Sequence, residues 1–311
     1  MPPAMLPQLD RPFLTDGGLE TDILFNRGID LPHFASITLL QSEEGRRALD
    51  DYFRGFLELA RRTGTGFILE SATWRASRDW AEPLGMSPDE LDALNREAIA
   101  MLLRLRQAHG SAATPVVVSG CIGPRGDGYE PGRVMSVNEA ETYHARQAGV
   151  LTDAGADMLT AITMTNVPEA VGVTRAAQAL GAPVAISFTV ETDGRLPAGD
   201  RLADAVAAID RATGTYPAYY MINCAHPTHF ASSLEDGAEW TSRVRGVRAN
   251  ASRCSHAELD AMTELDAGDP AELAAQHREL RRRFPGLTVL GGCCGTDLRH
   301  VTAIAEACLT G

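Results

Sequence analysis

No stretch of this 311-residue sequence is apolar for long enough to cross a lipid bilayer. Residues 1–13 contain prolines and lack the continuous apolar core of a secretory signal peptide. No basic cluster interrupts the excess of 41 acidic over 28 basic residues, and the formal charge of -13 repels nucleic acid and anionic lipid surfaces. These absences predict a cytoplasmic protein whose partners are small molecules. The oligomeric state stays open.

Linkers, low-complexity tracts and internal repeats are also lacking, so residues 1–311 are expected to form a single domain. Hydrophobic residues make up 44% of the chain, which is enough for a full core. The segment Asp16-Gly17-Gly18-Leu19-Glu20 does not match the glycine-rich fingerprint of dinucleotide-binding domains. An open doubly wound sheet is therefore the second choice of architecture.

Short apolar runs of strand type alternate with amphipathic helical stretches along the whole chain. The strands are expected at residues 13–17, 66–71, 115–120, 157–163, 183–190, 219–224, 244–250 and 287–292. Helices are expected between them, capped by Ser42, Ser87, Asn138 and Asp269, and later at residues 168–180, 200–213, 230–240, 270–284 and 297–309. Eight strand-then-helix units predict a single α/β domain of the closed parallel (β/α)8 type, a TIM barrel.

Three of the six cysteines stand at the ends of two predicted strands. Cys224 closes one strand, and Cys293 and Cys294 directly follow another, between glycines that permit a sharp turn. In a reducing compartment, grouped cysteines indicate metal ligands or catalytic groups rather than disulfides. Three thiolates leave one tetrahedral position of Zn2+ open to a substrate, as in catalytic zinc sites. The other three cysteines are expected to be small buried hydrophobic residues.

A barrel places its chemistry at the carboxyl ends of its strands. Polar residues indeed lie at or just beyond most of the predicted strand ends, and they are Asp16, Glu70, Cys121, Thr163, Cys224, Asn250, Cys293 and Cys294. The sequence therefore predicts one site at this rim.

Several segments resemble a known family. They are Asp16-Gly17-Gly18, Asn223-Cys224, the Gly-Gly-Cys-Cys-Gly of residues 291–295, and residues 73–77 and 120–124. In these segments the sequence is similar to the homocysteine S-methyltransferase family. The resemblance implies a zinc-containing barrel that moves a methyl group from an onium donor to the sulfur of homocysteine, which gives methionine.

The sequence departs from the family pattern at two positions. Ile162 replaces a glutamate that helps to hold the amino acid acceptor, and a buried ammonium group beside isoleucine would have no counter-charge. Either Glu70 supplies that charge, or the acceptor is a different thiol, or the donor pocket has been rebuilt. Trp74 stands where related sequences often have tyrosine, and this exchange reshapes the pocket near the donor.

Roles follow for the remaining candidates. Asp16, Glu70 and Asn223 form the expected catalytic set, although Asp16 also suits a turn cap and Asn223 a satisfied strand-end amide. The backbone N–H groups of Gly17 and Gly18 suit a substrate carboxylate.

Four further residues complete the expected site. Thr163 and Asn250 are assigned to substrate binding. Trp74 and Tyr129 either face an onium methyl group through a cation–π contact or simply pack in the wall.

The expected chemistry follows from the thiol. A free alkyl thiol has a pKa of about 8.5, and zinc binding removes its proton. A sulfonium or quaternary ammonium donor then loses its positive charge as the methyl group leaves, and in-line orientation supplies much of the rate. S-methylmethionine, S-adenosylmethionine and betaine-like compounds all fit this description.

Two other functions stay open at this stage. Zinc in a hydrolase would activate water, but such enzymes favour histidine and carboxylate ligands. A zinc-storing or thiol-binding protein would bind both without turnover.

Overall fold

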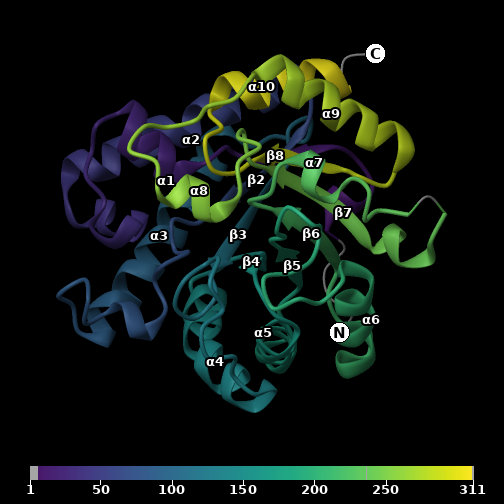
Figure 1. The fold of residues 1–311 in the computed structure, drawn as a ribbon. Coiled ribbons are helices and arrows are strands. Elements are labelled where there is room, and N and C mark those ends of the chain that lie inside the picture. The colour runs from purple at the N-terminus through teal and green to yellow at the C-terminus, as the bar shows by residue number, and fades with distance from the viewer. Residues whose placement is uncertain (1–5, 236, 310–311) are drawn as a thin grey trace.

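The computed structural model describes residues 6–235 and 237–309. Eight strands in this part of the chain pair in sequence order, all in parallel, and the first closes onto the last (Figure 1). They are β1 (Phe13–Leu14), β2 (Gly66–Glu70), β3 (Val116–Ile122), β4 (Met158–Met164), β5 (Val184–Phe188), β6 (Tyr219–Asn223), β7 (Val244–Ala249) and β8 (Val289–Gly292). The predicted TIM barrel is confirmed.

Helices surround this ring of strands (Figure 1). They are α1 (Leu19–Thr21), α2 (Glu43–Thr63), α3 (Pro88–His109), α4 (Val137–Asp153), α5 (Val167–Leu180), α6 (Leu202–Thr213), α7 (Pro227–Phe230), α8 (His256–Asp260), α9 (Pro270–Arg283) and α10 (Leu298–Leu309). Within residues 6–235 and 237–309, no helix combines the length and the apolar character needed to cross a membrane.

Three of the four predicted helix caps are confirmed. The side chains of Ser42, Ser87 and Asp269 accept hydrogen bonds from backbone N–H groups in the first turns of α2, α3 and α9. The prediction of Asn138 is wrong, because Ser136 and Glu139 form a reciprocal capping box that starts α4 two residues earlier.

The helix predicted at residues 230–240 is also wrong. Pro227 occupies the first turn of the short α7, and the His226 side chain accepts a hydrogen bond from the Thr228 N–H. The chain then turns, with Gly237 at a φ of 79°, before a 3-10 helix at Glu239–Arg243. The backbone preferences of proline and glycine therefore prevent the long helix that the apolar pattern predicted in this segment.

The barrel interior is filled at the ends where the strands begin. A separate apolar cluster there contains Leu6, Phe13, Ile68, Val117, Met158, Ala185, Tyr219, Met221 and Val289. The Gln8 side-chain amide donates to the Tyr219 hydroxyl at 3.4 Å, which anchors the N-terminal segment to this cluster. Among the described residues, apolar side chains therefore occupy the interior at this end of the barrel.

Buried His277 makes the fold acid-sensitive. This residue of α9 is 1% exposed, and burial lowers its pKa from 6.5 to about 4. The unfolded chain therefore binds a proton between these values while the folded chain does not, so the free energy of unfolding is expected to fall as the pH decreases from 7 to 4. On the order of 2 kcal/mol should be lost.

Urea unfolding of the wild type and of His277→Gln at pH 7 and pH 4.5 measures this contribution. The loss of stability on acidification should be smaller in the variant. Equal losses in the two proteins would assign the acid sensitivity to other groups.

Candidate metal centre

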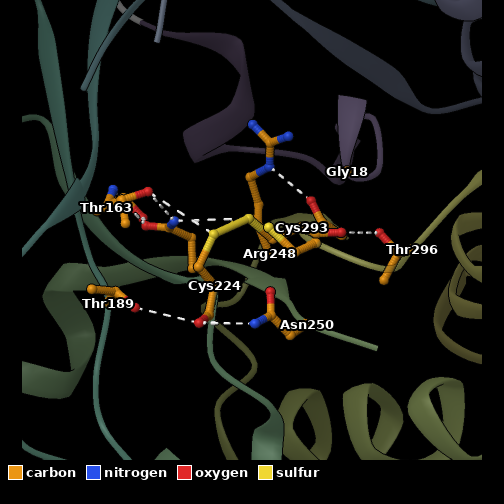
Figure 2. Close-up of a disulfide and its surroundings, with 12 residues drawn as sticks. Gly18, Thr163, Thr189, Cys224, Arg248, Asn250, Cys293 and Thr296 are labelled. Carbon is orange, nitrogen blue, oxygen red and sulfur yellow. Dashed lines mark hydrogen bonds between the residues drawn. A yellow bond between two sulfur atoms is a disulfide. The ribbon is translucent and has the colours of Figure 1, made fainter. Parts of the chain in front are cut away.

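Three cysteine sulfurs meet at the carboxyl ends of β6 and β8. Cys224 directly follows β6, Cys293 and Cys294 directly follow β8, and the three sulfur atoms lie within 4.8 Å of one another. A disulfide joins Cys224 to Cys293 in the structure (Figure 2), with their Cα atoms 5.3 Å apart. The expectation that all cysteines are reduced is thus wrong for this pair, because the fold brings their sulfurs into contact.

The backbone of Cys224 adopts the left-handed conformation, with a φ of 51°. For a residue other than glycine this conformation costs about 1 kcal/mol, and it turns the side chain towards Cys293. Three donors hold the Cys224 carbonyl oxygen, and they are Thr189 Oγ1 at 3.3 Å, Asn250 Nδ2 at 3.1 Å and His256 Nε2 at 2.6 Å. Figure 2 shows Thr189 and Asn250 on either side of this oxygen. In this structure Asn250 supports a candidate ligand.

Asn223 and Thr163 form a hydrogen-bonded pair beside the sulfurs. The side-chain Oδ1 of Asn223 accepts from the Thr163 N–H at 2.9 Å, and its Nδ2 donates to Thr163 Oγ1 at 2.9 Å. These bonds hold Thr163 at a φ of 61°, where the pairing register of β4 shifts. Thr163 Oγ1 then lies 3.9 Å from Cys224 Sγ, and the Asn223 amide lies 4.0 Å from Cys293 Sγ. Both residues therefore present polar hydrogens to the sulfurs.

The glycines after β1 pack directly on the cysteine turn. The Gly18 N–H, which was expected to bind a substrate carboxylate, donates to the Thr296 carbonyl oxygen at 2.9 Å in this structure. A Cβ atom on Gly18 would lie 2.5 Å from the Cys293 carbonyl oxygen, and one on Gly17 would lie 2.8 Å from that of Thr296. Glycine is required at both positions because the two backbones approach so closely.

Alanine at position 18 is expected to displace the cysteine turn. The added methyl group would clash with Cys293, which must shift, and zinc affinity should fall by at least about 10-fold, as for other supports of metal ligands. Gly149→Ala is the matched control, because its Cβ on α4 meets nothing within 4 Å. Competition with a chromophoric chelator measures both affinities, and an unchanged affinity of Gly18→Ala would contradict the assigned packing role.

Arg248 is the charged residue that sequence reasoning missed. Its guanidinium donates to Asp16 Oδ1 at 2.6 Å and to Glu70 Oε2 at 2.7 Å, and all three side chains are buried. Its Nε also donates to the carbonyl oxygen of Gly292, beside Cys293, at 3.2 Å. β7 contains two arginines, Arg245 and Arg248, three residues apart and so on opposite faces of the strand. This was the available signal, since a buried cation requires a buried partner.

Arg248, Asp16 and Glu70 form a buried triad of charges, and its two carboxylates differ in their surroundings. Burial raises the pKa of Asp16 to about 6; the Arg248 cation opposes the rise and Glu70 adds to it. Tyr52 also donates to Asp16 Oδ2, at 3.1 Å. Glu70 Oε1 is buried and has no hydrogen-bond partner among the described residues. One carboxylate oxygen near the cysteines therefore remains available to a ligand.

One cavity collects most of the predicted site residues. Asp16, Gly17, Gly18, Glu70, Trp74, Tyr129, Ile162, Thr163 and the three clustered cysteines all line it. Glu20 and Arg248 also line it and were not predicted. Asn223 and Asn250 lie behind this wall, where they contact the cysteines and Thr163.

A second cavity adjoins the first. Phe34, Trp74, Tyr129 and Cys294 line both, so these residues stand between the two spaces. The Tyr129 hydroxyl lies 3.6 Å from Cys294 Sγ. Asp127 and Asp260 contribute acidic groups to the second cavity, and Arg75 contributes a cation. Of the three clustered cysteines, Cys294 thus borders both cavities.

Comparison with known proteins decides the family. The family model described as homocysteine S-methyltransferase matches residues 13–308. The chain belongs to the homocysteine S-methyltransferase family. The resemblance seen in the sequence is therefore confirmed, and the enzyme class is that of the methyltransferases (EC 2.1.1), which in this family act on small molecules.

Individual members of the homocysteine S-methyltransferase family are distant from this chain. Homocysteine S-methyltransferase 4 of Zea mays is 26% identical over 259 residues, which cover 77% of this chain and 75% of the relative. Selenocysteine Se-methyltransferase of Brassica oleracea var. italica is 24% identical over 318 residues, with 94% and 87% covered. The metallated form of homocysteine methyltransferase MmuM from Escherichia coli shares the fold, with a TM-score of 0.75, 22% identity, and 98% and 99% covered.

Proposed function

We propose that this protein transfers a methyl group from an onium donor to a thiol that is held on zinc by Cys224, Cys293 and Cys294. The proposed acceptor is homocysteine and the product methionine. The observation that carries the proposal is the meeting of three cysteine sulfurs within 4.8 Å in a cavity at the carboxyl rim of the barrel. Membership of the homocysteine S-methyltransferase family supports it.

The donor set fits zinc. Tetrahedral zinc with Zn–S bonds of 2.3 Å places its sulfur ligands about 3.8 Å apart, within the spread of these three atoms. Reduction of the bond between Cys224 and Cys293 frees both sulfurs. Burial raises the pKa of the Cys294 thiol to about 11, so a cation is needed to hold this side chain as a thiolate at neutral pH. The metallated form of the Escherichia coli relative also supports this assignment.

Zinc, when bound, removes the proton of the acceptor thiol and keeps its sulfur nucleophilic. The residues of the chain orient the partners and exclude water. Asn223 and Thr163 direct polar hydrogens at the cysteine sulfurs and so fix their positions. The acceptor sulfur forms a bond to the methyl carbon while the donor heteroatom keeps the bonding electron pair and becomes neutral. The thiol proton passes to solvent.

The aromatic residues between the two cavities suit the donor. Trp74 and Tyr129 have ring faces that attract a methyl-bearing cation, and Phe34 closes the same boundary. The carboxylate of Asp260 adds a negative potential to the second cavity, whereas that of Asp127 is paired with Arg75 at 3.3 Å. A sulfonium or quaternary ammonium donor therefore fits this side, and the acceptor fits the first cavity.

The proposal that homocysteine is the acceptor depends on Glu70. Ile162 offers an apolar wall in the first cavity, where the family pattern has a glutamate. The unpartnered Oε1 of Glu70 supports a replacement, since it lines the same cavity and can accept a hydrogen bond from an ammonium group. Asp16 adds a second carboxylate nearby. A thiol without an amino group is the alternative acceptor that Ile162 favours.

A transfer assay by mass spectrometry tests the proposal. The reduced, zinc-loaded protein is incubated with a grid of S-methylmethionine, S-adenosylmethionine and betaine against homocysteine and thiols that lack an amino group. Methionine is the expected product, and Glu70→Gln should raise the KM of homocysteine more than that of the other thiols. Methylation of the other thiols alone would move the function to a different acceptor. No product from any pair would contradict the proposed transfer.

A further inference from the structure

A histidine in the loop after β7 contacts Cys224 directly and Cys294 through Tyr129. His256 opens the short helix α8, and its side chain is 7% exposed. Its Nε2 donates to the Cys224 carbonyl oxygen at 2.6 Å, the shortest of the three bonds to that atom. Its ring also stacks on Tyr129 with the centroids 4.1 Å apart. The Tyr129 hydroxyl reaches Cys294 Sγ at 3.6 Å.

We propose that His256 is a positioning residue of the metal site, which holds Cys224 through its carbonyl group and Cys294 through Tyr129. This inference rests on the proposed metal binding and extends it to a residue outside the cysteine cluster. The left-handed backbone of Cys224 is unfavourable by itself, and the hydrogen bonds to its carbonyl group offset that cost. Loss of the shortest bond therefore lets Cys224 relax away from Cys293 and Cys294.

The His256 ring is itself fixed from the opposite side. Nδ1 lies 3.1 Å from a carboxylate oxygen of Glu191, and the ring plane lies at 24° to that of Tyr129. A side chain with polar contacts at both nitrogens and a stacked ring has one orientation. Glu191 follows β5 and Tyr129 follows β3, so His256 joins segments that are far apart in the chain. Such outer supports of a metal ligand typically contribute 10- to 100-fold to metal affinity.

His256 also lines the second cavity, together with Tyr129 and Trp74. The residue that supports the ligands therefore forms part of the wall that faces the proposed donor. A change of His256 is expected to affect both the metal and the donor, whereas a purely structural residue of the loop would affect neither. Zinc affinity and the KM of the donor are thus independent readouts of one role.

His256→Asn, His256→Gln and His229→Asn make a matched series. Asparagine is too short to reach the Cys224 carbonyl oxygen, while the longer glutamine amide reaches it. His229 is the control, because its Nε2 donates to the exposed carbonyl group of Arg253 at 2.9 Å. Chelator competition gives the zinc affinity of each reduced protein. The thiolate-to-metal charge-transfer band of the Co2+-loaded form reports the geometry of the three sulfurs, and thermal unfolding of the metal-free form reports folding.

We expect His256→Asn to weaken zinc binding by about 10- to 100-fold and to alter the cobalt band. His256→Gln should recover part of the affinity, and His229→Asn should match the wild type. Wild-type affinity in His256→Asn would overturn the inference while leaving the proposed function intact. A wild type that takes up no zinc would contradict both. If His256→Asn does not fold, His256→Leu replaces it, because leucine has no donor for the Cys224 carbonyl oxygen, and an affinity equal to that of His229→Asn overturns the inference.

Discussion

Serine in place of Cys294 is expected to remove the zinc ion from the protein and to lower methyl transfer by more than about 100-fold. The hydroxyl group of serine stays protonated and is a poor ligand for zinc, and two cysteines alone leave the tetrahedral site incomplete. Cys294 is the most informative of the three positions because it lies outside the disulfide of the other two. Its replacement therefore leaves Cys224 and Cys293 able to form or release that bond as in the wild type, and the loss of one ligand is tested alone once the protein is reduced.

Metal analysis and the transfer assay measure the two effects on the reduced protein. Cys308→Ser is the control, since Cys308 is also free and only half-buried but lies on α10, away from the cluster. The control should keep about one zinc ion per chain and its activity. A Cys294→Ser protein that retains activity without metal would show that the cysteine cluster is not the centre of the chemistry.

Methionine in place of Arg248 is expected to destabilise the fold by about 3–5 kcal/mol at pH 7. The two carboxylates that Arg248 joins, Asp16 and Glu70, would then lie buried without a cation. Such a loss exceeds the net value of the ion pairs, because it includes the cost of the unpaired charges. Urea unfolding of the metal-free, reduced protein measures it.

The pH dependence identifies the cause. The pKa of Asp16 is already raised to about 6, and removal of Arg248 raises it further, so the folded variant binds a proton that the unfolded chain releases. The difference in the free energy of unfolding between the wild type and Arg248→Met should therefore shrink when the pH is lowered from 7 to 5. Arg46→Met is the control, because the Arg46–Glu97 pair is 41% and 33% exposed and solvent screens it, so its loss should leave the free energy of unfolding nearly unchanged. A similarly small loss in Arg248→Met would contradict the account of the triad.

Periodic features of the sequence predicted the fold. The eight strands lie within a few residues of the predicted ranges, because each is a short apolar run followed by a polar residue at the rim of the barrel. The exact strand ends depend on backbone conformation. β4 shifts its register around Thr163, whose left-handed φ is held by Asn223 from another strand. The sequence around Thr163 therefore cannot reveal its hydrogen bond to Asn223, which lies 60 residues away in the chain.

Contacts between loops limited the prediction of the site. Cysteine spacing and glycine context found the three clustered ligands, but the roles of the groups around them depend on the tertiary structure. Asn250 was expected to contact the substrate and instead holds the Cys224 carbonyl group. His256 was missed because it lies in a loop, where side-chain periodicity carries no information. Arg248 was missed because one buried cation is meaningful only when its two partners are known.

The most direct test of the central claim is X-ray absorption at the zinc edge of the reduced protein, recorded before and after addition of homocysteine. The account predicts three sulfur ligands at about 2.3 Å and one lighter ligand before addition, and four sulfur ligands afterwards. A fourth sulfur would show that the thiol binds where Cys224, Cys293 and Cys294 leave an open position. Nitrogen and oxygen ligands alone, or a spectrum unchanged by saturating thiol, would contradict the account.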